Sequence, residues 1–193
     1  QYSEILNKYF KYDQKIYENL HKLRDKIFKF DDLKKNEKEI NFLERKVTLF
    51  HAMVVKEISK SIERKVDFIG FHGQTIYHNP SEKISKQIGD GKLLSQLTKK
   101  NVVYNFRQND INNGGEGAPL TPIFHRQIVK QKKIELPVCI LNIGGIANVT
   151  AIDDYEKESF FSRDLGPGNC LIDQWIRNNT NNKFDKNGAI ATK

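Results

Sequence analysis

Four polar loops built around glycine constrain this chain more than any other feature of its sequence. Each lies next to a short apolar run of the kind that forms a strand. They occupy residues 71–78 (F-H-G-Q-T-I-Y-H), 105–122 (N-F-R-Q-N-D-I-N-N-G-G-E-G-A-P-L-T-P), 141–150 (L-N-I-G-G-I-A-N-V-T) and 162–169 (S-R-D-L-G-P-G-N). Glycine lets the backbone turn sharply and approach a ligand closely. Four such loops are more than a structural scaffold needs, so the pattern predicts that they form a site.

The loop at residues 162–169 carries the most chemistry. Asp164 stands in front of a Gly-Pro-Gly turn that we expect to open a helix. A carboxylate can accept a proton, and the free N–H groups at a helix N-terminus can hold a phosphate. An ordinary strand-to-helix turn has the same composition, so the motif alone leaves both interpretations open.

Composition describes a globular chain with a basic surface. Of its 193 residues 38% are hydrophobic, and the formal net charge is +8. The basic residues are scattered among acids, without a nucleic-acid-binding signature, so we expect no nucleic-acid partner. No apolar run has the length of a membrane span, and the start does not resemble a signal peptide, so we expect a soluble cytoplasmic protein that lacks its first residues. Cys139 and Cys170 lie in apolar runs, which predicts small buried thiols.

The hydrophobic pattern changes from helical to strand-like along the chain. Helical spacing predicts one helix over residues 2–30 and a second after the loop D-D-L-K-K-N-E, with an apolar face from Ile40 to Ile62, both covering a sheet. Strands are then predicted over residues 66–71, 76–78, 102–106, 138–143, 147–152 and 160–163, and short helices over residues 92–99, 123–131 and 170–178. Strands joined by hairpins and by helical crossovers favour an α/β fold.

The later loops divide the chain. Residues 141–150 should form a hairpin around Gly144 and Gly145, whose turn leaves backbone amides open to an anion. The polar stretch 108–117 is the best candidate for a crossing between lobes. We therefore assign residues 1–107 to the remainder of a first lobe, with the helix pair and strands, and residues 108–193 to the interlobe connection and the start of a second lobe.

Together the loops resemble those of the anhydro-N-acetylmuramic acid kinase family, bacterial sugar kinases of the actin-like, ribonuclease-H-like ATPase superfamily. Six motifs stand in the family's order and spacing from residue 67 onward: H-G-Q-T, Q-I-G-D, G-G-E-G-A-P-L, L-N-I-G-G-I-A-N-V-T, D-L-G-P-G-N and F-D-K-N-G. The helical first third matches only in character. The resemblance implies an α/β, actin-like fold of two lobes with a cleft, both lobes being incomplete in this chain.

The resemblance also implies a reaction. The family uses ATP to phosphorylate the 6-oxygen of 1,6-anhydro-N-acetylmuramic acid while water opens the anhydro bridge at the anomeric carbon, which gives N-acetylmuramic acid 6-phosphate in peptidoglycan recycling. In that scheme the acid of the D-x-G-P-G-N motif, by position Asp164, is the general base. A carboxylate beside a helix N-terminus stays ionised and suits this role. ATP and Mg²⁺ are the implied cofactors, the implied partners are small molecules, and a homodimer is left open.

Binding roles follow from the same resemblance. The substrate-binding candidates are His72, Gln74, Thr75, Arg107 and Asp110. The phosphate-binding candidates are Asn142, Gly144, Gly145, Gly166, Gly168 and Asn169. A guanidinium grips a carboxylate with two parallel hydrogen bonds, so Arg107 suits the lactyl group. Structural alternatives stay open: His72 as a hydrogen-bonded structural histidine, Arg107 paired with Asp110, and Asp110 as a cap on the following turn.

Two departures from the family pattern stand out. The family typically has D-F-R where this chain begins the motif with Asn105, and the phosphate-holding M-S-G-T-S-x-D-G loop is not in the sequence. We therefore expect an active full-length parent and an inactive fragment. The alternatives are a non-catalytic fragment or sugar-binding module of the same fold, or another actin-fold sugar or acetate kinase. An in-frame M-S-G-T-S-x-D-G before residue 1 would favour the kinase.

Overall fold

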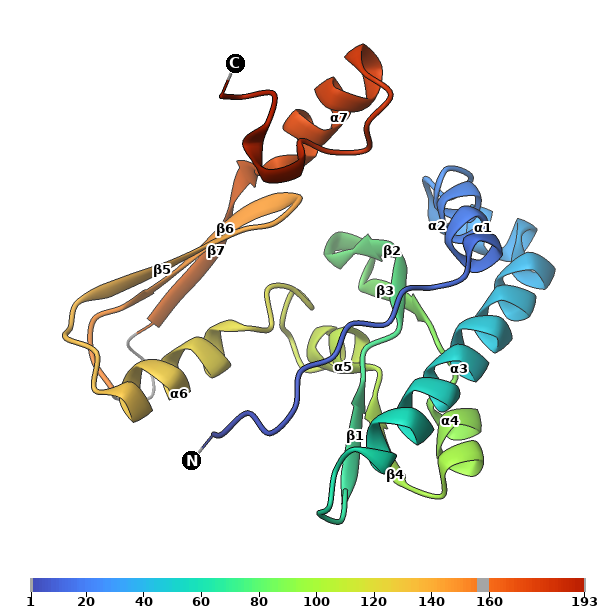
Figure 1. The fold of residues 1–193 in the computed structure, drawn as a ribbon, viewed down its shortest axis with the longest axis horizontal. Coiled ribbons are helices and arrows are strands. Elements are labelled where there is room, and N and C mark those ends of the chain that lie inside the picture. Colours follow the sequence, from blue (N-terminus) through green and yellow to red (C-terminus); the bar gives the residue numbers. More distant parts are fainter. Residues whose placement is uncertain (1, 156–159, 193) are drawn as a thin grey trace. The chain divides into compact units, whose positions relative to one another are not determined.

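The computed structural model describes residues 2–155 and 160–192. These form two compact units, one made of Ser3–Ala118 and the other of Pro119–Lys193 with Tyr2 (Figure 1). Both units combine helices and strands, so the mixed α/β class is confirmed. The division follows Ala118, whereas the lobe boundary predicted from sequence lies between residues 107 and 108. Within the described part of the chain, no helix combines the length and apolar character needed to cross a membrane.

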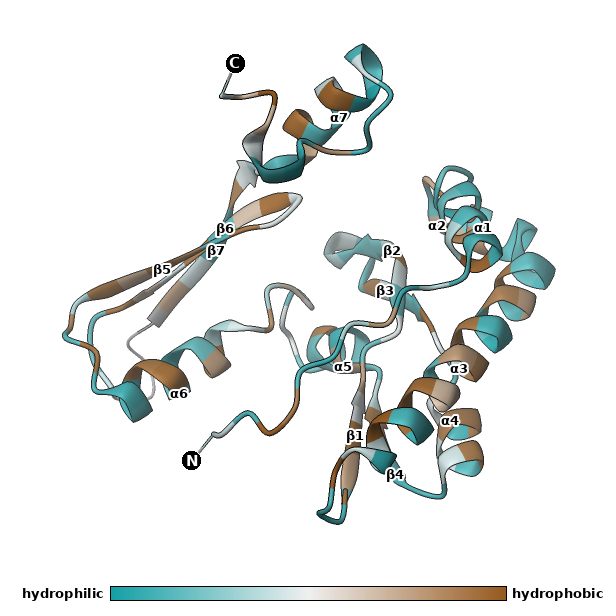
Figure 2. Ribbon diagram, viewed as in Figure 1, coloured by the Kyte–Doolittle hydropathy of each residue, from teal (hydrophilic) through white to brown (hydrophobic). Residues whose placement is uncertain are grey.

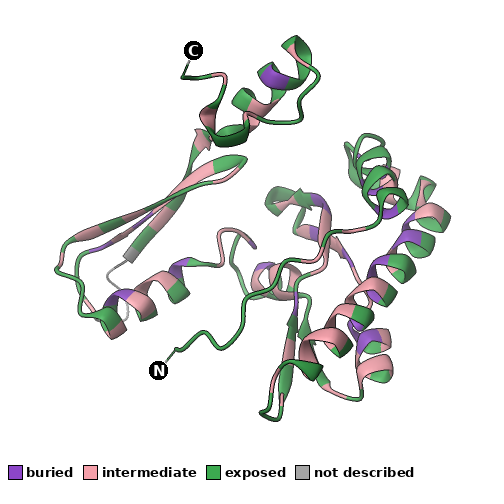
Figure 3. Cartoon of the chain, in the orientation of Figure 1, coloured by how far each residue is buried: buried purple, intermediate pink, exposed green. Residues whose placement is uncertain are grey.

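Three helices open the first unit: α1 (Gln14–Arg24), α2 (Phe30–Lys35) and α3 (Glu37–Lys60). The Asp13 carboxylate caps α1 by accepting a hydrogen bond from the backbone N–H of Ile16 at 2.8 Å. Apolar residues recur along one side of α3, and that side is the buried one (Figures 2 and 3). The main core joins α1, α3 and two strands through Ile16, Leu20, Leu23, Ile27, Ile40, Leu43, Val47, Ile76, Tyr77 and Ile88.

The first unit contains two small sheets. Strand β1 (Phe68–Phe71) pairs in parallel with β4 (Asn101–Tyr104), and helix α4 (Gly91–Thr98) precedes β4. Strand β2 (Gln74–Asn79) pairs antiparallel with β3 (Ile84–Ile88) across the short 3₁₀ helix η1 (Pro80–Glu82). Helix α5 (Phe106–Asn112) follows β4 directly. Because β1 and β4 are parallel, the segments that follow them leave the sheet in the same direction. These segments are residues 71–74 and 105–117, so the pairing brings two of the predicted loops together.

The second unit is a three-stranded antiparallel sheet with a helix before it and a helix after it. Helix α6 (Pro122–Lys132) leads into β5 (Val138–Ile143), β6 (Ile146–Ile152) and β7 (Phe160–Pro167), in the spatial order β5-β6-β7. Helix α7 (Asn169–Asn179) and the 3₁₀ helix η2 (Lys186–Gly188) complete this unit. The predicted hairpin at Gly144 and Gly145 is confirmed, since Ile143 pairs with Ala147 across it.

Several predictions of local structure are wrong. The helix predicted over residues 2–30 is restricted to α1, because no helical structure precedes the cap at Asp13. The predicted loop D-D-L-K-K-N-E contains most of α2, and the Asp32 carboxylate accepts hydrogen bonds from the backbone N–H groups of Phe28 and Lys29 just before this helix. Strand β3 and helix α5 were not predicted at all.

Cys139 is exposed, so the prediction of two buried thiols is wrong for this residue. It lies on edge strand β5 opposite Ala151. That face of the sheet is the reverse of the one on which Thr150 bonds to His125 of α6 at 2.9 Å. Cys170 is half-buried. The apolar run around Cys139 therefore reflects strand propensity more than burial.

A half-buried chain of polar side chains fastens the segment before α1 to α3. Nδ1 of His51 lies 2.8 Å from the Val47 carbonyl, which can only accept, so Nδ1 carries the proton. Nε2 is then free to accept from the Tyr12 hydroxyl at 3.5 Å, and Gln74 donates to that hydroxyl at 3.0 Å. Burial lowers the pKa of His51, with the Val47 contact acting in the opposite direction. The folded protein therefore keeps this imidazole neutral.

Neutral His51 makes the stability of the protein depend on pH. The unfolded chain takes up a proton near the ordinary histidine pKa of about 6.5, whereas the folded chain resists protonation until lower pH. The free energy of unfolding is therefore highest above that pKa and falls as pH decreases through it. We expect thermal unfolding midpoints to show a weaker acid-induced decrease in His51→Gln than in the parent.

Tyr12→Phe is the matched control, because it removes a partner of His51 but keeps the titrating imidazole. It should lower the midpoint at every pH and retain the acid-induced decrease. An identical pH dependence in the parent and in His51→Gln would show that His51 is already protonatable in the folded state.

Candidate active site

The N-terminus of α7 is docked on the β5-β6 hairpin by backbone hydrogen bonds. The N–H of Gly168 donates to the Gly145 carbonyl at 2.8 Å, and the N–H of Asn169 donates to the Gly144 carbonyl at 2.7 Å. The Asn169 side-chain amide donates to the Ile143 carbonyl at 3.1 Å. We call this set of contacts the hairpin clamp. It joins two predicted loops, 141–150 and 162–169, into one rigid arrangement.

The hairpin clamp requires glycine at its centre. A Cβ added to Gly168 would lie 2.3 Å from the carbonyl oxygen of Gly144 and 3.2 Å from the backbone nitrogen of Ala147. Nothing lies within 4 Å of a Cβ added to Gly145, so the hairpin tip is open on that side. The amides of Gly168 and Asn169, predicted to hold phosphate, are engaged by carbonyls here, and a phosphate could use them only if the clamp opened.

Asp164 lies inside a strand and not in a turn. Strand β7, predicted to end at residue 163, continues through Gly166 to Pro167. Asp164 pairs with Asn148 of β6, while Gly166 pairs with Ala147, so Leu165 is an extra residue that forms a bulge next to Asp164. Bulges redirect side chains and are common beside active sites. The Asp164 side chain is exposed, and no hydrogen bond or ion pair among the described residues engages its carboxylate.

In the first unit, His72 and Arg107 bond to each other. The Nε of Arg107 donates to Nε2 of His72 at 3.0 Å, and Nη1 of Arg107 donates to the Gly117 carbonyl at 2.8 Å. Because Nε2 of His72 accepts, its proton is on Nδ1, which donates to the Gly73 carbonyl at 3.0 Å. This arrangement needs a neutral His72. The histidine and the guanidinium are therefore oriented together, one from the end of β1 and the other from α5.

Asp110 holds the glycine-rich loop that follows α5. Its carboxylate accepts from the N–H of Gly117 at 2.8 Å, and its carbonyl accepts from the N–H of Gly115 at 2.9 Å. A Cβ on Gly115 would lie 2.1 Å from the Asp110 carboxylate, so this contact also depends on glycine. Among the described ion pairs there is none between Arg107 and Asp110. The observed geometry corresponds to the cap on the following turn.

Gln74 and Thr75 of the H-G-Q-T motif form hydrogen bonds with neighbouring side chains. Gln74 donates to the Tyr12 hydroxyl, and Thr75 accepts from Gln87 of β3 at 3.3 Å. Both side chains are half-buried. Any sugar contact by Gln74 or Thr75 would have to share these hydrogen-bonding groups.

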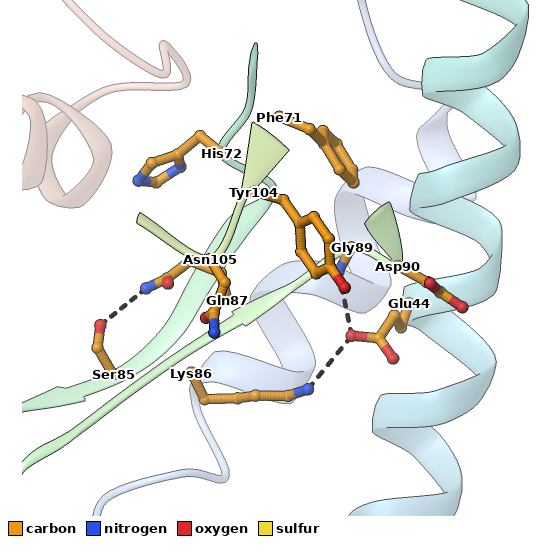
Figure 4. A pocket seen from close by; sticks show the side chains of 10 residues that line it. All are labelled: Glu44, Phe71, His72, Ser85, Lys86, Gln87, Gly89, Asp90, Tyr104 and Asn105. Carbon is orange, nitrogen blue, oxygen red and sulfur yellow. Dashed lines mark hydrogen bonds and ion pairs between the residues drawn. The ribbon is translucent and has the colours of Figure 1, made fainter. Parts of the chain in front are cut away.

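A cavity of about 270 Å³ opens between α3, β3 and the ends of β1 and β4 (Figure 4). Its lining residues are Glu44, Phe71, His72, Ser85, Lys86, Gln87, Gly89, Asp90, Tyr104 and Asn105. Lys86 pairs with Glu44 at 3.2 Å, and the same carboxylate oxygen accepts from the N–H of Gly89 at 3.2 Å. The cavity therefore offers both charges and several hydrogen-bonding groups.

Sequence reasoning did not assign Glu44, Lys86 or Gln87 to a site. The Q-I-G-D motif at residues 87–90 was the available signal, since it supplies three of the lining residues. Asn105 stands at the cavity with a φ of 63°, in the left-handed region that asparagine and aspartate both tolerate. Asparagine in place of the usual aspartate thus keeps the backbone turn and removes a charge.

The described residues do not form a protein-only metal site. Among them no three His, Cys, Asp or Glu side chains lie close enough together to hold a metal ion. Mg²⁺ in phosphoryl-transfer sites is bound by substrate phosphates with one or two carboxylates. Such an ion would depend on the nucleotide for most of its ligands.

Comparison with known proteins identifies the family. The family model described as anhydro-N-acetylmuramic acid kinase matches residues 5–193. The chain belongs to the anhydro-N-acetylmuramic acid kinase family. This family belongs to the actin-like ATPase superfamily, so the predicted resemblance and fold class are confirmed.

Relatives carrying that name match most of the chain. The anhydro-N-acetylmuramic acid kinase of Pelagibacter ubique is 61% identical over 190 residues, which are 98% of this chain and 51% of that protein. That of Agrobacterium fabrum is 46% identical over 153 residues, 77% of this chain and 40% of that protein. The chain thus spans about half the length of the curated family members that it matches.

Substitution of Gly168 tests the hairpin clamp. In Gly168→Ala the new methyl group would collide with the Gly144 carbonyl, so the two backbone hydrogen bonds of the clamp must lengthen or break. We expect a loss of about 1–3 kcal/mol in the free energy of unfolding, measured by denaturant titration. Gly145→Ala is the matched control on the open side of the hairpin and should change stability by less than about 0.5 kcal/mol. Equal effects of both substitutions would mean that the clamp is not a stabilising contact.

Proposed function

We propose that the full-length protein uses ATP to open 1,6-anhydro-N-acetylmuramic acid with water and to phosphorylate its 6-oxygen, giving N-acetylmuramic acid 6-phosphate. The observation that carries this proposal is Asp164, an exposed carboxylate beside a strand bulge in the D-L-G-P-G-N motif of a member of this family. The 61% identity to the Pelagibacter ubique protein of that name supports the same activity for this chain's parent.

In the proposed reaction Asp164 acts as the general base. It accepts a proton from a water molecule as the water oxygen bonds to the anomeric carbon. The bond between that carbon and the bridging 6-oxygen breaks, and its electron pair stays on the 6-oxygen. This oxygen then attacks the terminal phosphorus of ATP in line, and ADP leaves. An exposed carboxylate without a competing partner is well suited to accept the proton.

Arg107 supports recognition of the sugar's lactyl carboxylate in this proposal. Its Nε and Nη1 groups donate to His72 and Gly117, which fixes the guanidinium, and Nη2 makes no hydrogen bond to another described residue. A guanidinium oriented beforehand loses little conformational freedom on binding an anion. His72 would then act mainly on Arg107, and Asp110 on the loop that carries Gly117.

The neighbouring cavity is the proposed place for sugar hydroxyl groups. It is lined by His72 and Asn105 together with Lys86, Gln87 and Glu44. The side-chain oxygen of Gln87, Oε1, is buried and has no hydrogen-bond partner among the described residues. A ligand hydroxyl can donate to such an oxygen, whereas an apolar ligand would leave it unsatisfied.

ATP and Mg²⁺ are the proposed cofactors, and the cytoplasm, which supplies ATP, is the proposed location. The family name supports the use of a nucleotide, and the hairpin tip is open beside Gly145, where a Cβ would meet no atom within 4 Å. Mg²⁺ would supply charge neutralisation on the transferred phosphate. The remaining predicted phosphate contacts, at Asn142, Gly166, Gly168 and Asn169, stay predictions.

Asp164→Asn tests the proposed base in the full-length protein. The amide keeps the size of the side chain but cannot accept the proton as a carboxylate does. We expect sugar-dependent release of ADP to slow by about two to four orders of magnitude, with sugar and ATP affinity and the thermal midpoint close to those of the parent.

Asp153→Asn is the matched control, because Asp153 is an exposed aspartate just beyond β6 in the same unit. It should retain parental turnover. If Asp164→Asn turns over near the parental rate, or loses activity only by unfolding, Asp164 is a structural residue and the proposed mechanism is wrong.

A further inference from the structure

Three polar side chains form a row across the sheet of the second unit. Asn142 on β5 pairs with Asn148 on β6, and Asn148 pairs with Asp164 on β7. Residues that lie directly opposite each other on neighbouring strands share a face, with Cβ atoms about 4.5–5.5 Å apart. Asn148 therefore lies between the predicted phosphate contact and the proposed base. Asn148 is not among the site residues predicted from the sequence.

The same face is buried farther along the strands. Two residues beyond this row, Thr150 is fully buried. Its hydroxyl forms hydrogen bonds with Nδ1 of His125 at 2.9 Å and with the Ser162 hydroxyl at 3.4 Å. Asn148 is half-buried and Asp164 is exposed. Asn148 thus stands where the covered part of this face meets its open end.

Asn148 also has an unsatisfied polar atom. Its Oδ1 is buried and has no hydrogen-bond partner among the described residues. A buried carbonyl oxygen without a partner destabilises the folded state, because it has lost its hydrogen bonds to water. An apolar side chain would avoid that cost at this position, and the sheet itself gives asparagine no compensating bond. The missing partner is therefore a group that the described residues do not supply.

We propose that Asn148 is a second acceptor for the water molecule that Asp164 activates. This inference rests on the proposed function. A water molecule has two hydrogens, so one can bond to the Asp164 carboxylate and the other to Oδ1 of Asn148. Rotation about χ2 of asparagine is soft, so Oδ1 can turn to the open end of the face. Two acceptors orient the water and direct an oxygen lone pair at the anomeric carbon.

Asn148 takes no proton and forms no covalent bond in this proposal. The proton goes to Asp164, and the electron pair released from the anhydro bridge stays on the 6-oxygen. The contribution of Asn148 is to turnover and not to ground-state affinity, because the water is ordered before attack whether or not the sugar is bound tightly. Removal of Asn148 should consequently lower kcat and leave KM for sugar and ATP nearly unchanged.

The test compares Asn148→Ala and Asn148→Leu with the full-length parent. Both remove the acceptor, and leucine also fills the space, so a packing defect in one variant does not decide the outcome. We expect kcat to fall about 10- to 100-fold in each, as for loss of one hydrogen bond in a transition state, with a thermal midpoint at or above the parental value. Val149→Ala, on the opposite face of β6, is the control and should retain parental kcat.

A double variant separates this role from a structural one. Asp164→Asn with Asn148→Ala should be about as slow as Asp164→Asn alone, because two residues that act on one water are not additive. Three results would each overturn the inference. The first is a kcat of Asn148→Ala within about twofold of the parent, and the second is a pair of losses that multiply in the double variant. The third is a loss of kcat that occurs only together with a loss of stability. If Asp164→Asn itself retains parental turnover, the proposed function fails instead.

Discussion

The hairpin clamp is the constraint on which the second unit depends. Carbonyl groups of Gly144 and Gly145 accept the first N–H groups of α7, so the strand that carries Asp164 and the hairpin beside it cannot move independently. Gly168 makes this approach possible, since any side chain there would collide with the hairpin. The clamp uses amides that could otherwise have held an anion. It therefore favours a structural role for the Gly-Pro-Gly turn and leaves Asp164 as the residue proposed for acid–base chemistry.

In the first unit, side-chain hydrogen bonds fix neighbouring segments together, as backbone hydrogen bonds do in the hairpin clamp. Arg107 is held by His72 and Gly117, and Asp110 holds the loop to which Gly117 belongs. Arg107 and Asp110 are thus each fixed by at least one neutral partner, whereas Lys86 in the neighbouring cavity pairs with the charged Glu44. Such fixed groups reduce the ordering that a ligand must impose when it binds.

Sequence patterns predicted the helices and strands whose formation depends on local sequence preference. Strand β5 has the predicted bounds, and α4, α6 and α7 lie where apolar spacing and capping placed them. Strand β3 was missed because Lys86 interrupts its apolar alternation, and pairing with β2 stabilises it. Helix α5 was missed because its asparagine-rich sequence has low helix propensity, and contacts made by Asp110 compensate. Asn148 could be found only from strand register, which the sequence does not specify.

Turnover of the full-length protein in ¹⁸O-labelled water tests most directly whether the activated water attacks the sugar. Mass spectrometry of the products, taken early to limit exchange, locates the label. The account predicts one ¹⁸O at the anomeric hydroxyl of the phosphorylated sugar and none in its phosphate group or in free phosphate. Label in phosphate, or an unlabelled anomeric oxygen in the newly formed product, would contradict it.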